Sequence, residues 1–344
     1  MPAINDPDSK ILVTGGNGYL GAWIVDTLLQ RGHFVVAVVR NESKGKHLRE
    51  TFKSYGDKFQ LAYISELEKE GAFDEVVQDV HGIIHVASPV RLEMGEPSEI
   101  IDPAVKCVTG LLHSVLKHGT LVKRIVFTSS AATIYDQLSS GKTLSEADCN
   151  DSSIKECEER GKDARPIAKY MASKILAERA AWDIWRKSQS TVQWDLSAII
   201  PVWVFGPHKH DASKPEDFSA GTPQIWYWVV VRGEHVLGRA TPGDGWVDVR
   251  DCAEAHVRAL EVPAAGGERI LTCAGSPFKW QDFLDTANAI DPPPYHTIAK
   301  TLPSDVEIDA NYNSSKAEKI LGLKYRMMEE LTRDTLADYT RRGW

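Results

Sequence analysis

Long apolar runs are missing from this chain of 344 residues. No stretch reaches the roughly 18 consecutive apolar residues that a helix needs to cross a membrane, so we expect no membrane span. The first residues, Met1 to Lys10, are polar and lack the apolar segment of a secretory signal. We therefore expect a short frayed leader and a cytoplasmic protein.

Cysteine is scarce, and its five residues are widely spaced. They are Cys107, Cys149, Cys157, Cys252 and Cys273. None forms a CxxC pair, so the sequence predicts neither a disulfide framework nor a zinc site, and we expect no bound metal. Free thiols agree with a reducing compartment.

Positive charge is not in excess. The formal net charge is -8, whereas a nucleic-acid surface needs clustered Lys and Arg, so we expect no nucleic-acid partner. A hydrophobic content of 42% and a charged content of 26% are typical of a soluble globular enzyme. The partner we expect is a small molecule.

Residues 10–200 alternate short β-branched runs with amphipathic segments, which is typical of parallel strands joined by crossover helices. The expected strands are 10–14, 34–40, 59–64, 82–86, 123–128 and 194–200, and the expected helices are 21–31 and 166 to about 187. The pattern predicts an α/β fold, a Rossmann doubly wound parallel sheet with a smaller C-terminal substrate-binding lobe.

The composition changes after residue 202. Residues 203–246 are rich in Gly, Pro and large aromatic side chains, and 247–260 and 268–272 then return to the earlier pattern. We predict an NAD(P)-binding domain of 10–202 plus about 247–273, and a substrate-binding lobe of about 203–246 plus 274–344. The rings from Trp203 to Trp246 are expected to line an apolar pocket. The alternative is that they are ordinary core residues.

A glycine-rich turn follows the first expected strand. Its glycines are spaced as Gly15-x-x-Gly18-x-x-Gly21, a variant of the dinucleotide fingerprint. Glycine allows the backbone to approach a pyrophosphate closely, and the N-terminus of the following helix favours negative charge. The candidate cofactor contacts are Gly15, Asn17, Gly18, Tyr19, Leu20 and Gly21. The alternative is a structural turn.

The end of the second expected strand indicates which dinucleotide binds. An acidic residue there would hold the ribose of NAD, but this chain has Arg40, followed by Lys44 and Lys46. A guanidinium suits a 2′-phosphate, so we expect NADP(H). The alternative is a solvated loop charge, which nearby Glu42 leaves open.

A second motif, Tyr170-Met171-Ala172-Ser173-Lys174, lies on the helix expected from residue 166. Residues four apart share a helical face, so the phenol of Tyr170 and the ammonium of Lys174 can meet. A second such spacing, Tyr312 to Lys316, lies outside the nucleotide-binding unit and is set aside. The fifth expected strand, 123–128, runs into Thr128-Ser129-Ser130-Ala131, and doubly wound sheets form their sites at the C-terminal ends of strands.

These three side chains suit carbonyl reduction. A free phenol does not exchange its proton easily at neutral pH, but an adjacent ammonium favours the phenolate. Tyr170 would give a proton to a carbonyl oxygen as hydride arrives from the cofactor. Ser130 would hold that oxygen by hydrogen bonding, and Lys174 would also bind the nicotinamide ribose.

With these motifs in this order, the chain resembles the extended short-chain dehydrogenase/reductases. Within them it is similar to the dihydroflavonol-reductase-like group, including yeast-type NADPH-dependent methylglyoxal/isovaleraldehyde reductases. The resemblance covers nearly the whole chain. It rests on VTGGNGYLG, HVASP at 85–89, FTSSAAT at 127–133, YMASK, PVWVFGP at 201–207 and WVDVRDCAEAH at 246–256.

The resemblance implies roles for single residues. The matches to the family's catalytic residues are Ser130, Tyr170 and Lys174. The matches to its 2′-phosphate contacts are Arg40 and Lys44. Ala87 and Ser88 fall where the loop after the fourth strand approaches the cofactor, and Val204 falls where the backbone passes the nicotinamide. The VDVRD segment, 247–251, is implied to brace the loop between the lobes.

The chain departs from the family pattern at three places. Glu66 and Leu67 replace the usual Asp-hydrophobic pair near the adenine. Lys106 and Ile200 stand where Asn is common. These departures concern the adenine contacts and the path of the proton relay, and they leave the three catalytic candidates unchanged.

We therefore expect reversible, NADPH-dependent reduction of aldehydes and ketones to alcohols. One alternative is a nucleotide-sugar epimerase or dehydratase of the same fold, which Arg40 argues against because NAD is usual there. Another is a non-catalytic NADP-sensing protein, which would typically lack the Tyr-Lys pair. Both a monomer and a homodimer are compatible with the sequence.

Overall fold

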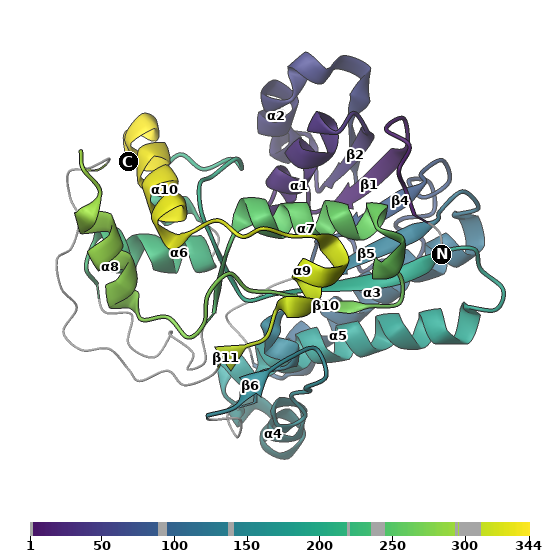
Figure 1. The fold of residues 1–344 in the computed structure, drawn as a ribbon. Helices are drawn as coiled ribbons and strands as arrows, with labels where there is room; N and C mark the ends of the chain where they lie inside the picture. Colours follow the sequence, from purple (N-terminus) through teal and green to yellow (C-terminus); the bar gives the residue numbers. More distant parts are fainter. Residues whose placement is uncertain are drawn as a thin grey trace.

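The computed structural model describes residues 3–88, 95–136, 141–218, 221–234, 245–292, 295 and 311–344. At its centre lies a seven-stranded parallel sheet in the order β10-β7-β5-β4-β1-β2-β3 (Figure 1). The strands are β1 (Lys10–Thr14), β2 (Phe34–Val39), β3 (Phe59–Tyr63), β4 (Gly82–His85), β5 (Arg124–Thr128), β7 (Asp195–Pro201) and β10 (Arg269–Thr272). The predicted α/β doubly wound sheet is confirmed.

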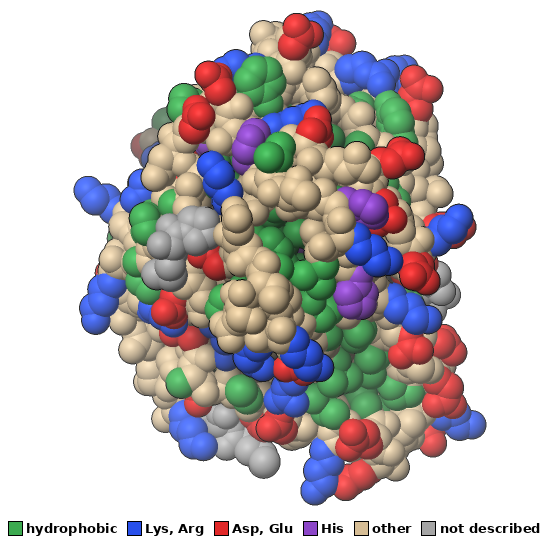
Figure 2. Space-filling model, turned by 90° about the vertical axis from the view of Figure 1, so that its right-hand side faces the viewer, with side chains coloured by type: hydrophobic (Ala, Val, Ile, Leu, Met, Phe, Trp, Pro, Cys, Tyr) green, Lys and Arg blue, Asp and Glu red, His purple; other side chains and the backbone are tan. Residues whose placement is uncertain are grey.

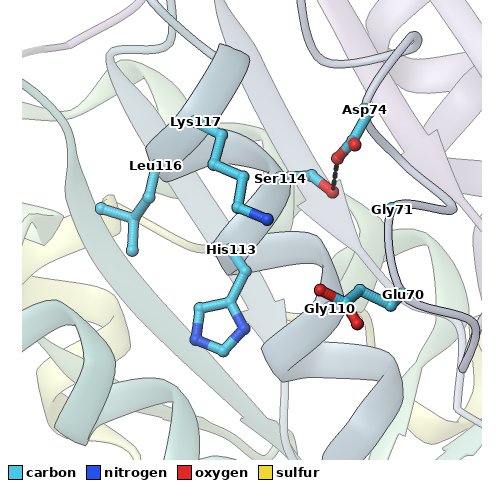
Figure 3. A pocket seen from close by; sticks show the side chains of 8 residues that line it. All are labelled: Glu70, Gly71, Asp74, Gly110, His113, Ser114, Leu116 and Lys117. Carbon is cyan, nitrogen blue, oxygen red and sulfur yellow. Dashed lines mark hydrogen bonds between the residues drawn. The ribbon is translucent and has the colours of Figure 1, made fainter.

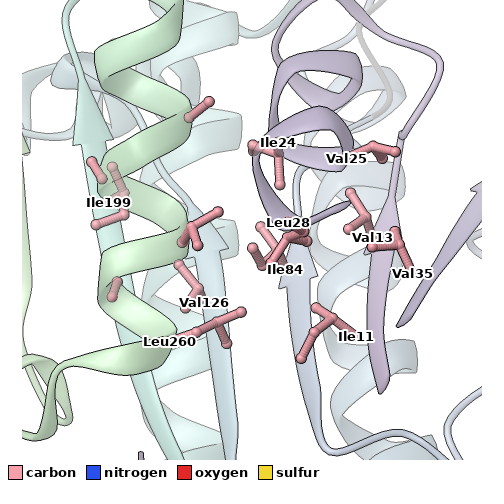
Figure 4. Packing of buried hydrophobic residues seen from close by; sticks show 14 of the residues in the cluster. Ile11, Val13, Ile24, Val25, Leu28, Val35, Ile84, Val126, Ile199 and Leu260 are labelled. Atoms are coloured by element: carbon pink, nitrogen blue, oxygen red, sulfur yellow. The ribbon is translucent and has the colours of Figure 1, made fainter. Parts of the chain in front are cut away.

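Helices cover both faces of this sheet. One face carries α1 (Tyr19–Gln30) and α7 (Val249–Glu261), and the other carries α3 (Ser98–His118) and α5 (Pro166–Ser188). Successive residues of a strand point to opposite faces, so Ile11 and Val13 of β1 pack under α1 and α7, whereas Leu12 packs under α3 and α5. Figure 4 shows the first of these layers, with Leu28 of α1 and Leu260 of α7 above the strands.

Most predicted boundaries agree with the structure within one or two residues, but several helices were not predicted, and two of these pack against the sheet. The first, α2 (Glu42–Thr51), buries only Gly45 and Leu48, so its sequence has little apolar periodicity. The second, α3, contains Pro103, and an internal proline usually ends or kinks a helix. Burial of the apolar face of α3 against the sheet outweighs that preference.

Three helices lie beside the sheet, on the left of Figure 1: α6 (Thr222–Trp226), α8 (Trp280–Ala289) and α10 (Met328–Arg342). The short strands β8 (Trp203–Phe205) and β9 (Trp246–Asp248) pair with each other and contribute to the same packing. They enclose an aromatic cluster in which Phe205, Trp226 and Trp246 are buried. This burial favours the core alternative for those rings, while Trp203 and Trp228 are only half-buried. The division into two domains stays a prediction.

Two further strands and two further α-helices are described. They are β6 (Thr143–Leu144), α4 (Ser152–Arg160), β11 (Asn311–Tyr312) and α9 (Ser315–Leu321). The motif residue Pro89 and two parts of the aromatic stretch, 219–220 and 235–244, lie outside the described residues.

The surface carries charge of both signs. On the face in Figure 2, basic and acidic side chains are mixed around a hollow lined by hydrophobic side chains. Among the described helices, none has the length and apolar character that a membrane span requires.

Candidate active site

Gly15 and Gly21, in the glycine turn between β1 and α1, are poorly compatible with a side chain. Gly15 has a φ of 69°, in the left-handed region that favours glycine. A Cβ on Gly21 would lie 2.1 Å from the Gly15 carbonyl oxygen, so α1 begins directly against the turn. Gly18 caps α1 without a side-chain hydrogen bond, which leaves the first N–H groups of the helix available to an anion. The turn therefore fits a pyrophosphate.

The side chains of the turn are engaged within the protein. The Tyr19 hydroxyl donates to the Gly206 carbonyl oxygen at 2.8 Å, and burial raises the pKa of Tyr19 well above its usual value. Leu20 packs against buried apolar residues, and Asn17 is half-buried. Tyr19 and Leu20 thus leave their backbone groups, rather than their side chains, for a ligand.

The end of β4 lies against the same turn. A Cβ on Gly15 would be 3.1 Å from the Ala87 Cα. Thr14 Oγ1 accepts the Ala87 N–H at 3.1 Å and lies 2.8 Å from His85 Nδ1. Burial lowers the pKa of His85 to about 3, so its imidazole is neutral and shares a single hydrogen bond with the Thr14 hydroxyl. This arrangement fixes Ala87, and the half-buried Ser88 follows it directly.

Two cations stand at the start of α2. Arg40 and Lys44 are exposed, and within the described ranges neither forms an ion pair. Glu42, which could have neutralised them, instead lies 3.5 Å from Arg49. Asn41 caps the helix by accepting the Lys44 N–H at 3.1 Å. Both cations therefore remain available to an anionic ligand.

The predicted adenine contacts follow β3. Glu66 is exposed, and Leu67 is half-buried against the core under α3. Because β4, β1, β2 and β3 are neighbouring parallel strands, the loops that follow them lie along one edge of the sheet. The structure thus brings the predicted cofactor residues from these four loops to a single edge.

Tyr170 and Lys174 lie one turn apart on α5, as their spacing predicts. Lys174 is 8% exposed, and Tyr170 is half-buried. After burial, the Lys174 charge is the second cause that lowers the pKa of His85, which places the ammonium near the end of β4. The Lys174 side chain therefore extends from α5, the helix that also carries Tyr170, toward the end of β4 and the loop that carries Ala87.

Three hydroxyls stand in a row at the end of β5, and their hydrogen bonds differ. Thr128 Oγ1 lies 2.8 Å from His256 Nε2, and the Ser129 hydroxyl donates to Glu178. Ser130 Oγ accepts the Ala132 N–H at 3.2 Å, and its own proton has no acceptor in the part of the chain that the structure describes. These bonds favour Ser130, the predicted residue, over its two neighbours.

Val204, in β8, packs against the same apolar cluster as Tyr170 of α5. Its neighbours Trp203 and Phe205 pack into the aromatic cluster. Val204 packs instead against a second cluster, which Tyr170 and Leu20 also contact. The alternation of the strand thus turns Val204 toward the predicted proton donor.

The second Tyr-Lys spacing does not form a comparable pair. Tyr312 belongs to β11, whereas Lys316 belongs to α9 and forms an ion pair with Glu268. The two side chains therefore do not share a helix face.

A surface depression of about 360 Å³ lies between α3 and residues 70–74 (Figure 3). Its lining residues are Glu70, Gly71, Asp74, Gly110, His113, Ser114, Leu116 and Lys117. None of them is a predicted site residue. Within this lining, the Asp74 carboxylate accepts the Ser114 hydroxyl proton at 2.6 Å.

Four residues that form hydrogen bonds around the site were not predicted. Thr14 and His85 hold the loop at Ala87, and Glu178 accepts hydrogen bonds from Ser129 and Arg269. The first two lie inside motifs that the sequence shows. Glu178 lies four residues after Lys174, so extending the helical spacing would have found it. Arg269 had no such signal, because it lies 91 residues from its carboxylate partner.

Known proteins resemble this chain over most of its length. The model of the NAD dependent epimerase/dehydratase family matches residues 11–274. Ketoreductase azaE of Aspergillus niger is 32% identical over 345 residues, covering 95% of this chain and 96% of the relative. The NADPH-dependent methylglyoxal reductase GRE2 of Saccharomyces cerevisiae is 29% identical, with 95% and 96% covered. The crystal structure of yeast methylglyoxal/isovaleraldehyde reductase Gre2 complexed with NADPH matches with a TM-score of 0.82 and 28% identity, covering 97% of this chain and 99% of that one.

Proposed function

The chain belongs to the NAD dependent epimerase/dehydratase family, and we propose that it is an NADPH-dependent reductase of aldehydes and ketones. This membership agrees with the resemblance to the extended short-chain dehydrogenase/reductases that its motifs indicate. The reaction produces alcohols and is reversible. The relatives support carbonyl reduction, since one is named a ketoreductase and another an NADPH-dependent methylglyoxal reductase. The similar yeast structure is described as a complex with NADPH.

The residues present fit this cofactor. The cradle formed by Gly15 and Gly21 leaves no space for a Cβ, and the uncapped start of α1 faces it. Arg40 and Lys44 would hold the 2′-phosphate. The proposed cofactor site comprises Gly15, Asn17, Gly18, Tyr19, Leu20, Gly21, Arg40, Lys44, Glu66, Leu67, Ala87, Ser88, Tyr170, Lys174 and Val204. When bound, NADPH supplies the hydride for the carbonyl carbon.

The chain's own residues would handle the proton. Tyr170 would donate its phenolic proton to the carbonyl oxygen, and the buried Lys174 would favour the phenolate that remains. Ser130 would hydrogen-bond to the same oxygen as negative charge develops on it. The observation that carries this proposal concerns the three consecutive hydroxyls beside α5: within the described residues, Ser130 is the one whose proton has no acceptor.

Finer properties follow from the surroundings of the site. Leu20, Ala131 and Val204 border the apolar cluster next to Tyr170, which favours a small apolar carbonyl compound. All five cysteines are free and four are buried, which supports a cytoplasmic location. The monomer and homodimer that the sequence allows are distinguishable by light scattering.

The test is oxidation of NADPH and of NADH with a panel of carbonyl compounds. The panel contains methylglyoxal, short branched aldehydes, aryl ketones and dihydroflavonols, and a parallel reaction contains NAD and nucleotide sugars. We expect NADPH oxidation with at least one carbonyl class. Interconversion of a nucleotide sugar without net cofactor consumption, or no oxidation with any carbonyl compound, would overturn the proposal.

A further inference from the structure

We propose that Glu178 is a positioning residue that holds Ser130 in place relative to Tyr170 and Lys174, an inference that rests on the proposed function. Glu178 lies on α5, one turn beyond Lys174 and two beyond Tyr170, and is 4% exposed. Residues at intervals of four follow one stripe of a helix. The helix that carries the proton donor therefore also carries a buried carboxylate toward the end of β5.

The first connection reaches Ser130 from the residue before it. The Ser129 hydroxyl donates to Glu178 Oε2, and the Ser129 N–H donates to the Ile199 carbonyl oxygen of β7 at 2.8 Å. Ser129 is 2% exposed, so water does not compete for these bonds. The peptide that leads into Ser130 is thereby tied to both α5 and β7.

The second connection reaches Ser130 through its carbonyl group. Glu178 Oε1 accepts the Arg269 Nε–H at 2.6 Å. Arg269 Nη2 donates to Thr133 Oγ1 at 3.2 Å, and the Thr133 hydroxyl donates to the Ser130 carbonyl oxygen at 2.9 Å. The carboxylate and its guanidinium partner thus restrain the backbone on both sides of Ser130, and no described residue accepts the Ser130 hydroxyl proton.

A purely stabilising role would not require this convergence. A buried ion pair contributes little net stability, because desolvation offsets its attraction. Its geometry is nevertheless strict, since Trp182 Nε1 also donates to Glu178 Oε1 at 3.1 Å and both carboxylate oxygens are satisfied. A displacement of about 1 Å in a catalytic group can lower a rate by roughly 100-fold. The network is placed to prevent such a displacement of Ser130.

The test breaks each connection without removing the carboxylate, because loss of Glu178 would leave the half-buried Arg269 without its ion-pair partner. Ser129→Ala breaks the first connection and Thr133→Val breaks the second. The control is Ser197→Ala, which removes another buried hydroxyl, one that donates to the Ala265 carbonyl oxygen at 2.6 Å in the neighbouring strand. All variants are assayed with NADPH and the panel compound that gives the highest kcat/KM.

We expect Ser129→Ala and Thr133→Val each to lower kcat by roughly tenfold, with the Kd for NADPH changed less than about twofold. Ser197→Ala should lower only the Tm. If Ser129→Ala and Thr133→Val keep the wild-type kcat and lose only Tm, the network is structural and the inference is overturned.

A Ser130→Ala background separates this inference from the proposed function. Because the network acts through Ser130, Ser129→Ala should cause no further loss of kcat in that background. An equal loss in both backgrounds would overturn the positioning role and leave the function standing. A Ser130→Ala enzyme with the wild-type kcat would instead remove the proposed role of Ser130, and the positioning role with it.

Discussion

Arg40→Ala should weaken the use of NADPH and leave the use of NADH nearly unchanged. Arg40 is exposed and forms no ion pair within the described ranges, so its removal leaves no buried partner behind. A hydrogen bond to a charged group contributes about 1.5–3 kcal/mol, which corresponds to roughly 10- to 150-fold in kcat/KM. Because solvent and salt screen an exposed charge, we expect the lower end, about tenfold, with a smaller effect at high ionic strength.

The assay measures kcat/KM for each cofactor at low and high salt with a saturating carbonyl substrate. Arg49→Ala is the matched control, since Arg49 lies on α2, the helix that follows Arg40, is 3.5 Å from Glu42 and donates to the Tyr63 hydroxyl at 2.6 Å. It should change both cofactors by less than about twofold. Equal losses for NADPH and NADH in Arg40→Ala, or the same loss in Arg49→Ala, would refute the assignment.

Gly21→Ala should raise the Kd for NADPH roughly tenfold or more, because the added Cβ would lie 2.1 Å from the Gly15 carbonyl oxygen. Gly82→Ala is the control, because its added Cβ would also be crowded, 2.4 Å from Ile4 Cδ1, but at the start of β4, away from the cofactor edge, and it should not change this Kd. Fluorescence titration with NADPH compares the two variants, and equal affinities would contradict the cradle. Stability should also fall as the pH drops from about 6 to about 4, because burial lowers the pKa of His85 to about 3 and that of His256 to about 4. On acidification, the unfolded chain binds these two protons at a higher pH than the folded chain does, so the free energy of unfolding should fall by up to about 3 kcal/mol per pH unit. Urea midpoints that stay constant over this pH range would contradict this prediction.

The sequence was sufficient for those parts of the molecule whose signals are local. The strand at 10–14, the glycine turn and the spacing of Tyr170 and Lys174 follow from periodicity and motif, and the structure has them where expected. Ser130 could be chosen by motif, but the reason for the choice appears only when the partners of Thr128 and Ser129 are known.

Features that depend on distant partners were not predictable. The pairing of Arg269 with Glu178 joins a late strand to α5, and no local pattern encodes it. The aromatic stretch was unpredictable for the same reason, because a sequence rich in aromatic residues looks the same whether rings such as Phe205 and Trp226 line a pocket or fill a core. Tertiary packing decides between these outcomes.

The proton donor is tested most directly by kcat and the Kd for NADPH in Tyr170→Phe, with Tyr312→Phe as the control for loss of a phenol in the other Tyr-Lys spacing. The substitution keeps the half-buried ring and removes only the hydroxyl. We predict a loss of roughly 10²- to 10⁴-fold in kcat with NADPH affinity changed no more than a few-fold, and a normal kcat for Tyr312→Phe. A Tyr170→Phe enzyme that retains a near wild-type kcat would contradict the proposed chemistry.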